Sequence, residues 1–236
     1  MAEARGKGWV VIDRFSDALY TPTEVARYLD VPSRTMGGWV DPRPGSTRQS
    51  IVTAGPVRVR GEARVPFIGL AEAYVLRAMR QAQLPMQRIR PALEKLAHDE
   101  HLRHALASER LFTDGAELLI DMAAGDKAAT DAVAELVVVR SGQRVLPEVV
   151  RDYLRRVTFS SGYAQVVPLP VFGDDTVVVD PSRGFGQPIF ATSGARVEDA
   201  IDLFKAGVDV HDVADEFAIS VEVLQQALRG RLSLAA

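Results

Sequence analysis

The sequence predicts an α+β protein, mainly helical, with a helix-turn-helix pattern at each end of a mixed middle region. Apolar residues recur at helical spacing near both ends of the chain, and short apolar runs bounded by glycine or proline fill the middle. The expected boundaries are residues 1–100 for an N-terminal winged helix-turn-helix, 101–172 for a connecting α/β region, and 173–236 for a C-terminal three-helix helix-turn-helix domain.

The first helix pair is predicted from its end signals. Thr21 and Glu24 have the spacing of a capping box, and Pro22 occupies the first helical position, where its missing N–H costs nothing. Residues 30–32, Asp-Val-Pro, end this helix, and a second short helix spans 33–40. Two short helices joined by a tight turn are the helix-turn-helix pattern.

The residues after this pair predict a β-ribbon, or wing. Residues 41–48 are rich in turn formers, and 51–53 and 57–59 alternate on either side of Ala-Gly-Pro at 54–56. We expect this ribbon to be followed by two longer helices. One spans Ile68 to about Gln81, and the other begins near Pro85 with Ile89, Leu93 and Leu96 facing inward.

The rest of the chain predicts strands and then helices. The middle has strand candidates at 111–120, around an Asp-Gly turn, and at 136–139 and 164–171, with an amphipathic helix at 147–156. A further strand at 176–179 precedes three helices, which start near Val197, near Val210 and after the capping residue Ser220.

Charge is divided unevenly along the chain. Residues 1–98 hold 15 Lys+Arg and 9 Asp+Glu (15 − 9 = +6), whereas residues 174–236 hold 5 and 11 (5 − 11 = −6). Either surface charge has drifted by chance, or the two ends meet different partners. An acidic C-terminal surface would repel phosphate, so there a protein partner is favoured over nucleic acid.

Cations gather on the second helix and the predicted wing. Ser33, Arg34 and Thr35 begin that helix, where amide groups and the helix dipole favour phosphate. The other candidate DNA contacts are arginines of the turn and ribbon: Arg43, Arg48, Arg58, Arg60 and Arg64. Helix, turn and basic ribbon in this order predict binding to double-stranded DNA. The alternative is a small helical core with a solvated arginine face.

The sequence offers little for catalysis. The chain has no cysteine, which excludes disulfides, thiolate nucleophiles and zinc fingers and fits a reducing cytoplasm. His98, His101 and His104 have a spacing that places the first and third about 120° apart on a helix, so we interpret them as a solvated helix end rather than a metal site. No phosphate-binding glycine loop occurs. We expect no enzyme activity, no metal, no cofactor and no membrane segment.

Two segments resemble known families. Residues 20–39 resemble the opening of MerR-like winged helix regulators, and 68–97 match the two helices that follow in that family. The run from Asp180 to Val197, with 206–207, 213–217 and 223–228, is similar to small helix-turn-helix domains of bacterial antitoxins, a family once of unknown function. Together these matches resemble a VapB-type antitoxin.

This resemblance implies a protein that neutralises a PIN-domain ribonuclease toxin, represses its own operon and forms a homodimer. It implies an arginine that reaches the toxin's acidic metal ligands, with Arg183, Arg196 and Arg229 as candidates. The chain departs from MerR-like helices at Gly37 and Gly38, which offer no side chain to DNA, so base readout is expected from residues 33–35. The alternative function is a stand-alone regulator that senses a small molecule and has no toxin partner.

Overall fold

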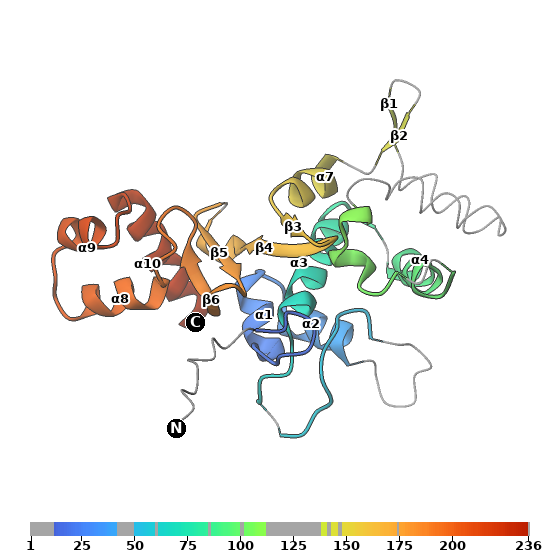
Figure 1. Ribbon diagram of the computed structural model, residues 1–236, viewed down its shortest axis with the longest axis horizontal. Coiled ribbons are helices and arrows are strands. Elements are labelled where there is room, and N and C mark those ends of the chain that lie inside the picture. Colours follow the sequence, from blue (N-terminus) through green and yellow to red (C-terminus); the bar gives the residue numbers. More distant parts are fainter. Residues whose placement is uncertain are drawn as a thin grey trace, which may run out of the picture.

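The computed structural model describes residues 12–41, 50–59, 61–84, 86–99, 102–111, 138–140, 143–145, 148–173 and 175–235 (Figure 1). Three of the predicted DNA contacts, Arg43, Arg48 and Arg60, lie outside these residues, as does most of the predicted strand pair at 111–120.

The predicted N-terminal helix pair is confirmed. Helix α1 (Pro22–Tyr28) begins with the capping box, in which Thr21 Oγ1 accepts from the Glu24 amide at 3.1 Å and Glu24 Oε2 accepts from the Thr21 amide at 2.7 Å. Helix α2 (Ser33–Val40) buries Met36, Trp39 and Val40. Because this apolar side of α2 is buried, the opposite side of the helix faces solvent.

The two helices that follow are also confirmed. Helix α3 (Phe67–Gln81) is buried along nearly its whole length, and α4 (Met86–Asp99) buries Ile89 and Leu96. Gly69 of α3 lies directly under the loop that precedes it, since an added Cβ would come within 2.2 Å of the Thr53 carbonyl oxygen. Helix α3 is therefore a buried helix on which this loop packs.

The predicted β-ribbon is wrong, because no strand occurs among the described residues 50–59. The amides that the ribbon would have paired are already bound elsewhere. The Ile51 and Val52 amides donate to the Trp39 carbonyl at 2.9 and 3.2 Å, and the Thr53 amide donates to Glu72 Oε2 at 2.6 Å. The wing is a loop that packs on α2 and α3.

The middle of the chain forms an antiparallel sheet with the order β3-β4-β5-β6. Its strands are β3 (Thr158–Ser160), β4 (Tyr163–Pro168), β5 (Val177–Asp180) and β6 (Arg183–Phe190). Helix α7 (Glu148–Arg155) was predicted, as were β4 and β5, whereas β6 was not, because two glycines and a proline interrupt its apolar pattern. A separate hairpin pairs β1 (Val138–Arg140) with β2 (Gln143–Val145), and 3-10 helices η1 (Ala105–Ala107) and η2 (Pro170–Phe172) complete the connections.

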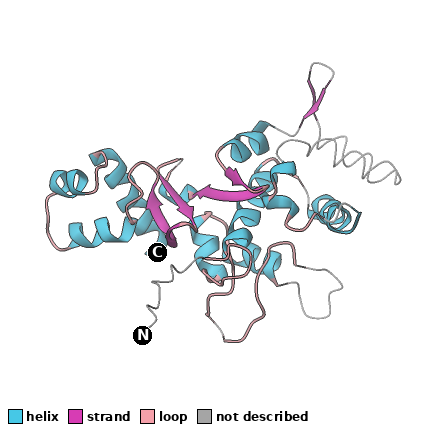
Figure 2. Cartoon of the chain, in the orientation of Figure 1, coloured by secondary structure: helices cyan, strands magenta, loops and turns pink. Residues whose placement is uncertain are grey.

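The three predicted C-terminal helices are confirmed as α8 (Val197–Lys205), α9 (Val210–Glu216) and α10 (Val221–Ala235). They form one end of the molecule, drawn in orange and red in Figure 1, with α1 and α2 nearer the centre. Figure 2 shows the sheet between these C-terminal helices and the helices of the rest of the chain.

One apolar core connects the two ends. It extends without interruption from Tyr20 through the sheet to Ala227 of α10. The Tyr20 side chain is 2% exposed, and its hydroxyl donates to the Gly186 carbonyl of β6 at 2.7 Å. Arg14 adds hydrogen bonds to the sheet, at 2.9 Å to both Gln165 Oε1 and the Ser160 carbonyl. Among the described helices, none is long and apolar enough to cross a membrane.

Candidate nucleic-acid interface

The exposed side of α2 begins with the three residues that the sequence singled out. Ser33, Arg34 and Thr35 are all exposed. The helix contains no acidic residue, and its N-cap residue, Pro32, supplies no side-chain cap. The Thr35 amide donates to the Pro32 carbonyl at 2.8 Å, whereas the Ser33 and Arg34 amides have no acceptor among the described residues and are open to an outside one, with no carboxylate of the helix to compete for them.

Three contacts hold α2 in place. The tight turn before it is closed by the Val31 amide, which donates to the Ala26 carbonyl at 2.8 Å. The wing loop binds its C-terminal end through Trp39, as described above. Arg90 of α4 donates from Nη2 to the Gly38 carbonyl at 3.3 Å. This last contact could not be predicted from the sequence, because Arg90 and Gly38 are far apart in the chain.

The wing arginines differ in their surroundings. Arg58 is exposed and forms no ion pair with any described residue. Arg64, by contrast, has a side chain only 12% exposed, which pairs with Asp41 and donates to the Gly55 carbonyl at 3.1 Å. Arg64 thus ties the wing loop to the end of α2, while Arg58 extends into solvent.

A buried carboxylate anchors the same loop. Glu72 of α3 is 3% exposed, accepts from the Thr53 amide and from Thr53 Oγ1 at 3.1 Å, and lies 2.9 Å from His104 Nδ1. His104 also packs against the Phe15 ring, so the interpretation of this histidine as part of a solvated helix end is wrong. No group of three or more His, Asp or Glu residues that could hold a metal ion occurs in the described part of the chain.

A cavity of about 360 Å³ opens beside this network. Thr53 and Glu72 line it together with Arg90, Glu94 and His104. Because Arg90 also contacts α2, a molecule in this cavity would touch a residue that positions the exposed helix.

The C-terminal arginines are mostly engaged within the chain. Arg183 Nε lies 2.8 Å from Asp180 Oδ2, and Arg196 Nη1 lies 3.7 Å from Asp199 Oδ1. Arg229 is exposed and has no ion pair with a described residue. Of the three candidates for toxin contact, Arg229 is therefore the one without an ion pair to any residue that the structure describes.

Asp180 organises the hairpin between β5 and β6. It is 4% exposed, and its carboxylate accepts from Arg183, Ser182 and Gln165. Burial acts to raise the pKa of Asp180, but these hydrogen bonds outweigh it and hold the pKa below its ordinary value.

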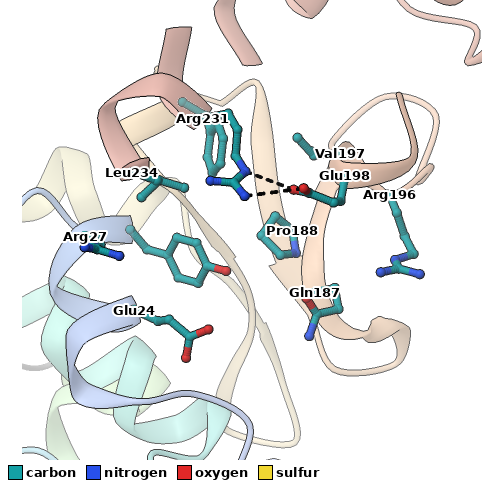
Figure 3. A pocket seen from close by; sticks show the side chains of 11 residues that line it. Glu24, Arg27, Gln187, Pro188, Arg196, Val197, Glu198, Arg231 and Leu234 are labelled. Carbon is teal, nitrogen blue, oxygen red and sulfur yellow. Dashed lines mark hydrogen bonds and ion pairs between the residues drawn. The ribbon is translucent and has the colours of Figure 1, made fainter. Parts of the chain in front are cut away.

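A second cavity, of about 300 Å³, lies where α1 meets β6, α8 and α10 (Figure 3). Across it, Arg231 of α10 donates from Nε to Glu198 Oε2 of α8 at 3.1 Å. Burial, with the nearby charges of Glu24 and Glu198, raises the pKa of Tyr28 to about 12. The ion pair joins α8 to α10, while residues of α1 line the cavity beside it.

Two family models match the chain at its two ends. Residues 18–93 match a family described as "Putative DNA-binding HTH domain", and residues 177–229 match "Protein of unknown function (DUF433)". The first match covers α1, α2, the wing loop, α3 and most of α4. The second covers β5, β6, α8, α9 and α10 as far as residue 229.

Whole-chain relatives come from Mycobacterium tuberculosis (strain ATCC 25618 / H37Rv). "Putative antitoxin VapB45" is 44% identical over 226 residues, which are 91% of this chain and 94% of that protein. "Uncharacterized protein Rv2308" is 25% identical over 221 residues, or 89% and 88% of the two chains.

The crystal structure of Rv2018 from Mycobacterium tuberculosis is similar in fold. It matches with a TM-score of 0.80 and 45% identity, over 91% of this chain and 99% of that one. Since both the sequence and the architecture extend over nearly the full length of these relatives, the chain belongs to the family of the protein named "Putative antitoxin VapB45" and carries a DNA-binding helix-turn-helix domain at its N-terminal end.

Proposed function

We propose that the protein is a VapB-type antitoxin that represses its own operon as a homodimer in the cytoplasm, using its MerR-like N-terminal part to bind operator DNA. The observation that carries this proposal is the exposed, acid-free face of α2, on which the side chains of Ser33, Arg34 and Thr35 have no partner among the described residues. Helix α2 would enter the major groove, which admits an α-helix. Arg58 would contact the phosphate backbone beside it.

We propose further that the acidic C-terminal part binds a PIN-domain ribonuclease toxin, and that the protein itself is not an enzyme. The net charge of −6 over residues 174–236 (5 − 11) suits a basic, RNA-binding partner surface. Arg229 is the candidate for the arginine that reaches the toxin's acidic metal ligands, because Arg183 and Arg196 are paired with carboxylates of their own chain.

The DNA part is tested by the salt dependence of binding. Each phosphate contact contributes about one unit to the slope of log K against log salt concentration. We expect Arg58→Ala with Arg60→Ala to weaken binding to all duplexes and to reduce that slope by up to about one unit per lost contact. Fluorescence anisotropy over a series of salt concentrations measures it. An unchanged slope would show that the wing loop does not contact DNA. A wild-type protein without salt-sensitive affinity for duplex would overturn the proposed DNA binding.

The toxin part is tested first by whether a PIN-domain nuclease gene adjoins this one, and then by coexpression with that nuclease. We expect wild-type protein to restore growth and to copurify with the nuclease. Arg229→Ala should weaken both effects, while Arg34→Ala, at the other end of the chain, should leave both unchanged. Rescue that survives Arg229→Ala would exclude Arg229, and failure of the wild-type protein to rescue would contradict the antitoxin function for that pair.

One observation favours the second candidate function, a stand-alone regulator that senses a small molecule. The 360 Å³ cavity beside Arg90 has the size of a small-ligand site, and Arg90 contacts α2. A small molecule that raises the melting temperature and changes operator affinity, in a protein that copurifies with no nuclease, would favour this function over the antitoxin.

A further inference from the structure

The exposed face of α2 loses its side chains halfway along the helix. Successive residues of a helix are rotated by about 100°, so Arg34 and Gly38 share one outward stripe, and Ser33 and Gly37 share the adjacent one. Gly38 is exposed and Gly37 is partly so. The C-terminal half of the face is therefore bare backbone.

Nothing within the described chain requires glycine at these two positions. Neither residue has a positive φ, and a Cβ added to either would meet no atom within 4 Å. Gly69 of α3 is different, because there an added Cβ would collide with Thr53. Two adjacent glycines weaken a helix relative to alanine, so the fold loses stability at α2 without an internal gain.

The C-terminal helix-turn-helix shows that this fold accepts side chains at the same place. Helix α9 and the turn to α10 repeat α1 and the turn to α2, with 188 added to each residue number (222 − 34 = 188). At the positions of Gly37 and Gly38, α10 has Gln225 and Gln226, both helical. Glycine is thus not a requirement of the architecture.

Cations flank the bare stripe at both ends. The Cα–Cβ bond of a helical residue tilts toward the N-terminus, so the Arg34 side chain extends away from Gly38. At the other end, Arg90 donates to the Gly38 carbonyl and places its guanidinium there. A polyanion approaching the bare backbone would find positive charge on either side of it.

We propose that Gly37 and Gly38 form a close-approach contact for duplex DNA, against which the DNA packs directly on the α2 backbone while Arg34 and Arg90 take phosphates on either side. This proposal rests on the proposed DNA-binding function. Glycine suits such a contact because it lets another molecule come close to the backbone. Side chains as small as a methyl group would push the helix out of the groove.

The test separates stability from binding, because the two should change in opposite directions. We expect Gly37→Ala with Gly38→Ala to raise the melting temperature, by about 2–4 °C per substitution. The same variant should lose about tenfold or more in affinity for a duplex that the wild-type protein binds. Gly38→Gln, which copies the residue of α10, should lose more, since its side chain is longer.

Gln225→Ala is the matched control, because it changes the position in α10 that corresponds to Gly37. It should leave DNA affinity at the wild-type value. A glycine variant that is stabilised but binds duplex as tightly as wild type would overturn the proposal while leaving DNA binding by α2 intact. A wild-type protein that binds no duplex would instead overturn the proposed function and this contact with it.

Discussion

The two helix-turn-helix units share a backbone and differ in chemistry. In both, a seven-residue helix ends in a turn with one left-handed residue, Asp30 (φ 48°) in the first and Ala218 (φ 51°) in the second. The same hydrogen bond closes each turn, from the Val31 amide to the Ala26 carbonyl at 2.8 Å and from the Ile219 amide to the Ala214 carbonyl at 3.0 Å. The geometry that presents the next helix is thus the same.

The helices that these turns present carry opposite charges in their first turn. Arg34, near the start of α2, corresponds to Glu222 of α10, and the bare glycines of α2 correspond to glutamines. Helix α9 adds Asp212, Asp215 and Glu216, all exposed. The comparison teaches that a helix-turn-helix backbone by itself does not define a DNA-binding site. The residues on the presented helix decide whether phosphate is attracted or repelled.

The strongest test of this comparison is to give the first turn of α2 the charge that the first turn of α10 has at Glu222. We expect Arg34→Glu to reduce affinity for operator duplex about a hundredfold, or about 2.7 kcal/mol, because it replaces an attraction to phosphate or base with a repulsion. Titration at constant salt measures the loss. Glu222→Ala is the matched control and should not weaken binding. If both variants lost affinity equally, the two units would share the DNA and the comparison would fail.

A second prediction concerns how each helix is held. Helix α10 continues past the length of α2 and packs on η2, where an added Cβ at Gly230 would lie 2.5 Å from Phe172 Cδ1 and 2.8 Å from the Val171 carbonyl oxygen. We expect Gly230→Ala to lower the free energy of unfolding by about 2 kcal/mol, because backbone must shift to admit the methyl group. Urea denaturation measures this. Unchanged or increased stability would show that α10 is not fixed by this contact.

Much of this architecture could be predicted from the sequence, because local signals are strong where the helices begin. Thr21, Glu24 and Pro22 define the start of α1, and Ser220 marks the start of α10. Strand β6 was not predicted, because Gly184, Gly186 and Pro188 have a weak strand preference. Pairing with β5 makes this segment a strand despite that preference. Pairing between strands of this kind produces no periodic pattern of apolar residues in the sequence from which a strand could be predicted.

The candidate site was predictable only in its local part. Ser33, Arg34 and Thr35 were identified because helix start and charge are adjacent in sequence. The ribbon was wrong because Glu72, far along the chain, binds the Thr53 amide that a ribbon would have used. Arg90 and Arg64 likewise take their roles from partners distant in sequence, Gly38 and Asp41. Tertiary hydrogen bonds, which spacing does not encode, account for each of these differences.

A third prediction uses pH to test whether the arginines of the C-terminal unit stabilise the fold through ion pairs within the chain. Asp180 has a pKa below its ordinary value of 3.8, so its contribution to stability is present above about pH 4 and is lost as pH falls through the lowered pKa. We expect Asp180→Asn to cost about 1.5 kcal/mol at neutral pH, because the hydrogen bond from Arg183 loses its charged acceptor. Denaturation at several pH values measures the difference.

The stability difference between wild type and Asp180→Asn should shrink as the solution is acidified below pH 4, since wild-type Asp180 then becomes neutral as well. Gln165→Ala, which removes one donor and leaves the carboxylate, should keep a pH dependence of the same sign, with the pKa of Asp180 moved toward its ordinary value. A difference that stays constant across this range would mean that the charge of Asp180 is unimportant and that Arg183 is free for a partner.

The smallest effect should come from the link between the two units. We expect Tyr20→Phe to lower the free energy of unfolding by about 1 kcal/mol, because the buried Gly186 carbonyl loses the donor that it has at 2.7 Å. Because Arg34 and Arg58 remain in place, duplex affinity should stay at the wild-type value. Unfolding followed both by tryptophan fluorescence, from Trp9 and Trp39, and by far-ultraviolet circular dichroism should still give one transition. We expect a single transition because the apolar core is continuous from Tyr20 to Ala227. Two separate transitions in the variant would instead show that the basic and acidic units unfold together only because of this hydrogen bond.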